Sequence, residues 1–130
     1  MIEAKENFNN TWPFNPNFFS GNGFKQHYVD EGKENNKVIL CLHGEPTWGY
    51  IYRHFIKELS KNFRVVVPDL MGFGKSETPK NKEYSLKTHV ENLENLVNYL
   101  ELKNIYFVGQ DWGGPILGAY TLRNLTNTKG

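Results

Sequence analysis

The sequence predicts an α/β fold with a mostly parallel, doubly wound sheet. Three short apolar runs resemble strands buried on both faces, and they alternate along the chain with segments of helical periodicity. This order calls for right-handed crossovers, so the three strands should lie parallel in one sheet with helices on both faces. No repeat or linker divides the 130 residues, so we expect a single domain over residues 1–130.

The N-terminal part precedes the parallel core. Residues 1–23 are rich in Asn, Pro and aromatic residues without periodicity, so we expect an irregular arm packed on the body. Residues 24–32 alternate in polarity and end at Gly32, as is typical of an early antiparallel strand. The first buried strand is then the apolar run VILCL at residues 38–42.

A helix and a second buried strand follow. We expect the helix from about Trp48 to Leu59, because Ile51, Phe55 and Leu59 stand four apart on one face. The second strand is RVVVPDL at residues 64–70, and a turn-rich loop follows it.

The clearest helix covers residues 85–100, and Ser85 can cap its start. One apolar stripe runs along it: Leu86, Val90, Leu93, Val97 and Leu100. NIYFV at residues 104–108 predicts the third buried strand, and a further helix is expected from Gly113 to about Asn124.

Composition argues against several classes of partner. The chain has 15 Lys and Arg against 14 Asp and Glu, which gives no electrostatic basis for binding nucleic acid or an anionic membrane. No apolar run approaches the roughly 20 residues of a membrane span, and the N-terminus lacks the apolar stretch of a signal peptide. The single cysteine, Cys41, lies in an apolar strand and fits a reducing compartment, so we expect a buried thiol and a cytoplasmic location.

The segment FVGQDWGGP at residues 107–115 resembles a nucleophile elbow. It reads G-x-D-x-G where serine hydrolases have G-x-S-x-G, and the small residues Gly109 and Gly113 suit a strained strand-to-helix turn. Asp111 taken alone could equally be a helix N-cap. The segment HGEPTW at residues 43–48 is the loop that follows the strand at residues 38–42. Ligands of such folds bind beyond the carboxyl ends of the strands, and this favours Asp111 as a nucleophile.

A carboxylate nucleophile suits attack at an alkyl carbon, where it displaces a leaving group and forms an ester. The indole N–H of Trp112 donates and cannot accept, which suits a departing halide. Backbone N–H groups of Trp112 and Glu45 could hold a developing oxyanion. This chemistry calls for no metal and no cofactor.

Three motifs carry a family resemblance, in the expected order and spacing over roughly residues 24–125: HGEPTWGYIYR, PDLMGFGKSETP and VGQDWGGP. The chain resembles the haloalkane dehalogenases of the α/β-hydrolase superfamily. The resemblance implies a halogenated alkane as substrate, Asp111 as nucleophile, Trp112 as halide-binding donor, and Glu45 with Trp112 as oxyanion-hole amides. In one branch of the family an Asn stands at the position of Glu45. The Glu here resembles the branch whose second halide contact is a Trp from the cap domain.

Two other interpretations fit parts of these motifs. Epoxide hydrolases also use an Asp nucleophile followed by Trp, but Glu45 and Gln110 favour the dehalogenases. GFGKS at residues 72–76 suggests a phosphate loop, but Asp69 stands where that motif requires its first glycine, so we expect a tight structural turn.

The family continues beyond the helix after the nucleophile, with a cap, further strands, an acid and a C-terminal histidine. The chain therefore looks like the N-terminal part of an α/β-hydrolase domain, truncated before the cap and the C-terminal strands. None of its four histidines (His27, His43, His54 and His89) is expected to face Asp111 as a general base.

The 130-residue chain by itself should not turn over a haloalkane, although Asp111 could be alkylated once. A full-length protein is expected to be a monomer, whereas the fragment should aggregate through the unpaired edge of residues 104–108. A non-catalytic truncated fragment remains the alternative from a different functional class.

Overall fold

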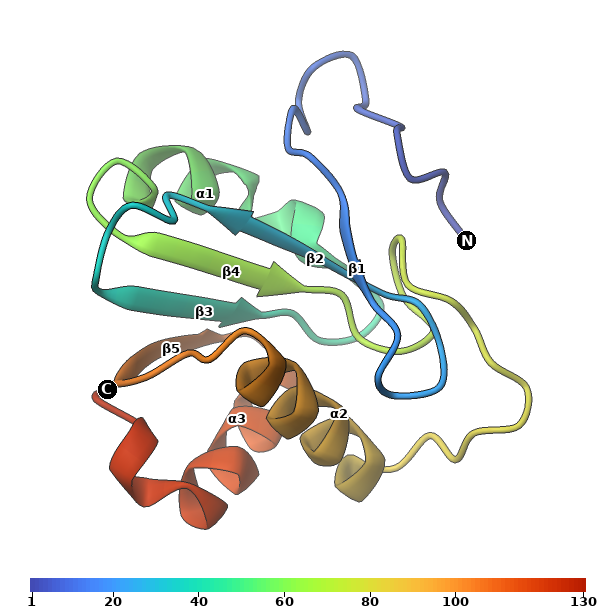
Figure 1. The fold of residues 1–130 in the computed structure, drawn as a ribbon. Coiled ribbons are helices and arrows are strands. Elements are labelled where there is room, and N and C mark those ends of the chain that lie inside the picture. Colours follow the sequence, from blue (N-terminus) through green and yellow to red (C-terminus); the bar gives the residue numbers. More distant parts are fainter.

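The computed structural model describes residues 1–130 as one mixed sheet with helices on both faces (Figure 1). The strand order is β1-β2-β4-β3-β5. The strands are β1 (Asn17–Phe19), β2 (Gln26–Glu31), β3 (Val38–Leu42), β4 (Arg64–Pro68) and β5 (Ile105–Gly109). β3 pairs in parallel with β4 and β5, whereas β2 pairs antiparallel with β1 and β4.

The predicted fold class is confirmed, but the sheet is more mixed than expected. The arm of residues 1–23 contributes the short strand β1, which its sequence did not reveal because three residues are too few to show a period. Trp12, in the same arm, is buried against the second of the two hydrophobic clusters described below. The arm is therefore part of the core as well as an outer layer.

Strand β3 divides the core into two layers because its side chains alternate between the faces of the sheet. Val38, Leu40 and Leu42 pack in one hydrophobic cluster with α2 (Leu86–Tyr99) and α3 (Gly113–Arg123). Ile39 and Cys41 pack in the other with α1 (Arg53–Leu59). Figure 1 shows α1 on one side of the sheet and α2 with α3 on the other, as the doubly wound prediction requires.

The helix expected from Trp48 to Leu59 begins differently. Gly49–Tyr52 form a 3-10 turn, and the α-helix runs only from Arg53 to Leu59. The tighter turn shifts the phase of the helix, so Tyr52 and Ile56 face the core while Phe55 is 46% exposed. The predicted face is therefore wrong for Phe55, whereas Ile51 and Leu59 are half-buried and pack against the second cluster.

Helix α2 begins where predicted, because Ser85 Oγ accepts a hydrogen bond from the Thr88 backbone N–H at 3.2 Å. The middle of the expected stripe, from Val90 to Val97, is buried, and Leu96 joins it. Leu86 is exposed, because it belongs to the first turn and lies beside the site described below. No helix of the structure has both the length and the apolar character needed to cross a membrane.

The loop after β4 is held by the buried carboxylate of Asp69. It accepts hydrogen bonds from Gly49 N (2.8 Å), Lys75 N (2.9 Å) and His27 Nδ1 (2.8 Å). A side chain at Gly74 would collide with this carboxylate, and Lys75 Nζ donates to two carbonyls of the N-terminal arm. GFGKS thus forms a structural turn, as expected.

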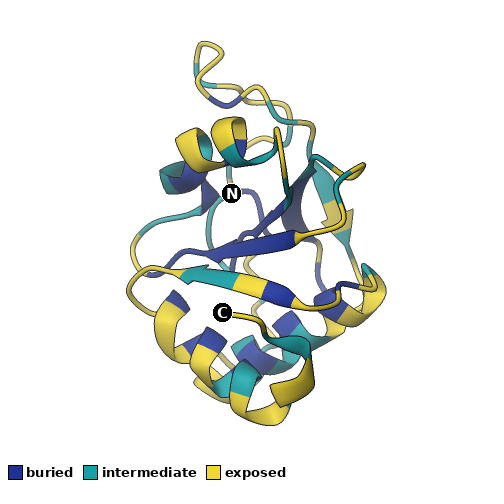
Figure 2. Cartoon of the chain, turned by 90° about the vertical axis from the view of Figure 1, so that its left-hand side faces the viewer, coloured by how far each residue is buried: buried dark blue, intermediate teal, exposed yellow.

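The outer edge of β5 is partly covered. Lys129 N donates to Ile105 O at 2.8 Å and Phe107 N donates to Gly130 O at 2.7 Å, so residues 128–130 pair beside β5 in parallel. A short 3-10 turn, Leu125–Asn127, leads into them. Figure 2 shows the C-terminus beside this incompletely buried strand, whose Tyr106 is 42% exposed. The unpaired part of the β5 edge is therefore shorter than predicted, and aggregation of the fragment through this edge stays a prediction.

Candidate functional site

Asp111 stands on a strained turn between β5 and α3. Its φ of 53° lies in the left-handed region that few non-glycine residues adopt. The turn is fastened to the neighbouring strand, since Gln110 N donates to Leu42 O at 3.1 Å, and Gly113 N closes the turn by donating to Gln110 O at 2.9 Å. Strain of this kind at the carboxyl edge of a sheet is a reason to look there for function.

Two glycines let the loops after β3 and β5 approach each other. A Cβ at Gly44 would lie 2.5 Å from the Asp111 carboxylate and 2.6 Å from Trp112 N. A Cβ at Gly113 would collide with the carbonyl oxygens of Leu42 and His43, which are backbone atoms that cannot rotate away. The close approach of backbone to backbone is the physical reason for glycine at both positions.

A pair of glycine substitutions in α3 tests this packing. Gly113→Ala is expected to destabilise the protein by about 1–3 kcal/mol, because the new methyl group overpacks the turn. Gly118→Ala is the matched control, since no atom lies within 4 Å of its added Cβ, and it should stabilise the helix by about 1 kcal/mol. Urea unfolding measures both, and equal stabilities of the two variants would contradict the close approach.

The carboxylate of Asp111 is held by the backbone. Its Oδ2 accepts a hydrogen bond from Glu45 N at 3.0 Å, and no side chain donates to it. This bond and the backbone N–H of Trp112 lower the pKa of Asp111 below its usual value. Asp111 is therefore an anion at neutral pH and lies exposed at the surface of the turn.

Gln110 fixes the two loops relative to each other. Its Oε1 accepts hydrogen bonds from Gly44 N at 3.1 Å and from Thr47 Oγ1 at 3.4 Å. No sequence pattern indicates this role, because the residues that Gln110 joins lie more than sixty positions away from it. Gln110 is one reason that the Glu45 N–H meets Asp111.

Trp112 lies beside Asp111 and opens α3. It is 49% exposed, and its indole N–H donates to no atom of the chain. It lines a cavity of about 200 Å³ that we call the elbow pocket. The eight residues around this pocket are Glu45, Leu70, Tyr84, Ser85, Leu86, His89, Trp112 and Ile116.

Three of the four histidines lie away from the elbow pocket. The buried His43 donates from Nδ1 to Gly44 O at 2.8 Å and accepts at Nε2 from Leu70 N at 2.9 Å, so both ring nitrogens are engaged. Burial lowers its pKa, which keeps it neutral. His27 bonds to Asp69, and His54 is exposed on α1 across the sheet.

His89 is the exception because it lines the elbow pocket, although Asp111 is not among the residues that line this pocket, so the expectation that no histidine faces Asp111 as a general base stays a prediction. It stands one turn into α2 and lines the elbow pocket with Trp112 and Glu45. Leu86 and His89 stand three residues apart, so they lie on one face of the helix. This spacing could have indicated that both line the same pocket.

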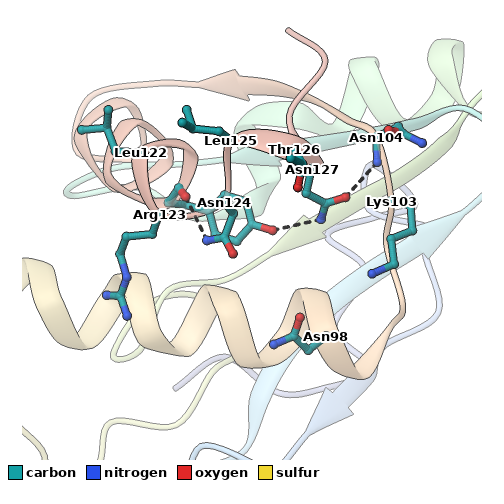
Figure 3. Close-up of a pocket in the computed structure, with 10 residues that line it drawn as sticks. Asn98, Lys103, Asn104, Leu122, Arg123, Asn124, Leu125, Thr126 and Asn127 are labelled. Carbon is teal, nitrogen blue, oxygen red and sulfur yellow. Dashed lines mark hydrogen bonds between the residues drawn. The ribbon is translucent and has the colours of Figure 1, made fainter.

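The remaining surface offers a larger but less suitable cavity. A pocket of about 620 Å³ opens at the C-terminal end of α3, lined mainly by amide and basic side chains such as Asn98, Arg123 and Asn127 (Figure 3). Asp111 precedes the N-terminus of this helix, whose 11 residues span about 16 Å, so the larger pocket does not include the elbow. No three His, Cys, Asp or Glu side chains gather as a metal site.

Comparison with known proteins supports the fold and the family. Residues 37–129 match the model of the alpha/beta hydrolase fold. Haloalkane dehalogenase 2 of Mycobacterium tuberculosis is 39% identical over 119 residues, which are 92% of this chain and 41% of that protein. The chain therefore spans about two fifths of the length of this relative.

Two solved structures extend the comparison. The tetrameric haloalkane dehalogenase DpaA from Paraglaciecola agarilytica NO2 superposes with a TM-score of 0.85 at 38% identity, covering 91% of this chain and 42% of that one. An epoxide hydrolase from Vigna radiata superposes with a TM-score of 0.82 at 30% identity, covering 90% of this chain and 38% of that one.

Proposed function

This chain belongs to the α/β-hydrolase family, and we propose that it carries the nucleophile-bearing part of a haloalkane dehalogenase that acts on halogenated alkanes. One observation carries the proposal. Asp111 stands on a strained elbow with its carboxylate bound to the Glu45 N–H, while the indole N–H of its neighbour Trp112 has no partner. A nucleophile and a donor for a leaving anion thus stand side by side.

The first chemical step is displacement at carbon. A carboxylate oxygen of Asp111 forms a bond to the carbon that bears the halogen, and the carbon–halogen bond breaks with its electron pair leaving on the halide. The negative charge thus moves from the carboxylate to the halide, and a neutral ester remains. The Glu45 N–H keeps Oδ2 in place during this step, so the carboxylate needs no reorientation.

The halide needs a hydrogen-bond donor where it departs. Trp112 supplies an N–H that makes no other bond, and a donor-only group suits a halide, which can only accept. The indole ring is about half exposed, which leaves room for a halide to reach and leave it.

The second step is attack of water on the ester carbonyl. The backbone N–H groups of Glu45 and Trp112 are suited to stabilise the oxyanion that forms, since they already lower the pKa of the same carboxylate. This step also needs a base. His43 has both ring nitrogens engaged, His27 is bonded to Asp69, and His54 lies across the sheet, while His89 lines the elbow pocket, whose lining does not include Asp111. We therefore propose that the 130-residue chain releases one halide and stays alkylated.

The protonation state of Asp111 gives a pH prediction. Because its pKa is lowered, the nucleophilic anion is fully formed from about pH 5 upward, and the alkylation rate should be flat from about pH 5 to pH 9. Intact-mass measurement of adduct formation at several pH values checks this. An apparent pKa inside that range would mean that a second ionisable group takes part in the first step.

An epoxide hydrolase is the second candidate, because the epoxide hydrolase from Vigna radiata has the same fold and is 30% identical to this chain. Opening an epoxide requires an acid for the oxygen. Tyr84 in the elbow pocket donates its hydroxyl proton to Pro79 O at 3.0 Å, so it is not free for that task. Parallel incubation with hexyl bromide and with 1,2-epoxyhexane separates the two. We expect bromide release and a hexyl adduct, and an adduct from the epoxide alone would favour the alternative.

The cellular setting is also a proposal. Cys41 is a free, fully buried thiol, which supports a cytoplasmic location. A monomer is proposed for the protein that carries this domain, although the relative DpaA is tetrameric. Size-exclusion chromatography of the native protein measures the oligomeric state.

A further inference from the structure

The elbow pocket is not uniformly apolar. Leu70, Leu86 and Ile116 form part of its wall, as an alkyl chain requires. Glu45 and His89 also line it, and neither makes a side-chain hydrogen bond within the chain. A substrate that is only hydrocarbon would leave the half-buried His89 without a partner when it displaces water, whereas the exposed Glu45 carboxylate still reaches solvent.

The imidazole of His89 presents one particular nitrogen to the pocket. Its Nδ1 is enclosed and has no hydrogen-bond partner. Its Nε2 also has no partner in the chain but is not enclosed, so it is the nitrogen that a ligand can reach. An enclosed N–H without an acceptor is rarer in proteins than an under-satisfied acceptor, so the ring proton belongs on Nε2.

The charge state of the ring agrees with this assignment. Burial lowers the pKa of His89, and the Glu45 carboxylate only partly opposes that effect. The neutral ring therefore offers a single N–H donor at Nε2. Its basic nitrogen, Nδ1, is enclosed, so the ring presents a donor to the pocket and not a general base.

The other polar groups of the wall already have partners. Ser85 Oγ accepts from Thr88 N as the cap of α2, and the Tyr84 hydroxyl donates to Pro79 O. His89 supplies a free donor and Glu45 supplies a free acceptor. A hydroxyl group is both an acceptor and a donor, so it can satisfy both side chains at once.

We propose that the elbow pocket receives the far end of the substrate and that His89, with Glu45, selects halogenated alcohols over plain haloalkanes. The inference rests on the proposed function, because the reacting carbon is taken to lie at Asp111. It narrows the proposed substrate class from halogenated alkanes to halogenated alcohols. The substrate has a halogen at one end for Asp111 and Trp112, a short alkyl chain, and a hydroxyl at the other end for the pocket wall.

The test compares alkylation of Asp111 by 6-bromohexanol and by hexyl bromide, with rates measured by intact mass. One added hydrogen bond should give the alcohol an advantage of about fivefold. His89→Phe keeps an aromatic ring without a donor and should lower the ratio toward one, because only the Glu45 acceptor remains. His89→Gln restores an N–H donor and should recover part of the preference, whereas the matched control His54→Phe, on α1, should keep all of it.

A second measurement does not depend on alkylation. The ring nitrogens of His89 are followed by ¹⁵N NMR while 6-chlorohexanol or hexyl chloride is added to the protein. We expect a saturable shift at Nε2 with the alcohol and a smaller one with the plain chloride. If the shift appears and no adduct ever forms, the proposed function fails while the binding inference survives. An unchanged Nε2 signal, or an equal rate ratio in wild type and His89→Phe, overturns the inference.

Discussion

Asp111→Asn is expected to abolish both the release of bromide from an alkyl bromide and the formation of a covalent adduct. An amide has no negative charge with which to displace a halide, so the rate should fall by at least about 10⁴-fold. The fold should survive, because Asn tolerates the left-handed backbone conformation seen at this position and still offers an oxygen to the Glu45 N–H. Bromide measured by ion chromatography and adduct measured by intact mass give two independent readouts.

Glu45→Gln is the matched control for this experiment. In the proposed mechanism, Glu45 acts on Asp111 through its peptide N–H, which the substitution leaves in place. Alkylation by hexyl bromide should therefore change by less than about threefold, as for a surface substitution worth a few tenths of a kcal/mol. An Asp111→Asn protein that still forms the adduct, or a Glu45→Gln protein that cannot, would contradict the assignment.

Trp112→Phe is expected to slow alkylation of Asp111 by about a hundredfold. The substitution keeps an aromatic ring and the backbone N–H but removes the one indole N–H proposed to bind the departing halide. The loss should be larger for chloride than for iodide as leaving group, because a smaller anion gains more from a hydrogen bond. Rates for hexyl chloride, bromide and iodide measured side by side would show this order.

Trp48→Phe provides the comparison. Trp48 packs against Phe8, Trp12 and Tyr50 and does not line the elbow pocket, so its loss should leave the alkylation rate nearly unchanged. If both tryptophan variants slow the reaction equally and without dependence on the halide, Trp112 acts through packing and the halide-donor proposal is wrong.

The fold was predictable where one local pattern decides each element. The continuous run VILCL has the character of a strand buried on both faces, and Ser85 before a periodic stripe marked the start of α2. The helix after β3 was placed within the right residues, but its first turn is a 3-10 turn, and nothing in the segment marks where that turn ends. Strand β1 was missed because its three residues pair only through tertiary structure.

The sequence predicted the elbow residue Asp111 better than the pocket residues around it. The G-x-D-x-G pattern indicated a strained turn, and Asp111 has the positive φ that such a turn requires. His89 was assigned to a helix correctly, but the sequence does not say which end of α2 approaches the elbow. That position depends on how the loop after β4 returns the chain to the sheet, and Asp69 and its distant hydrogen-bond partners fix that loop.

The most direct test of Asp111 as the nucleophile is to locate the adduct. The protein is incubated with hexyl bromide, digested, and mapped by tandem mass spectrometry, with released bromide counted in parallel. We expect one hexyl group per chain, attached to Asp111, and one bromide for each adduct. Cys41 should remain unmodified, because it is fully buried and burial raises the pKa of its thiol to about 12. No adduct, or an adduct on any other residue, would contradict the role of Asp111.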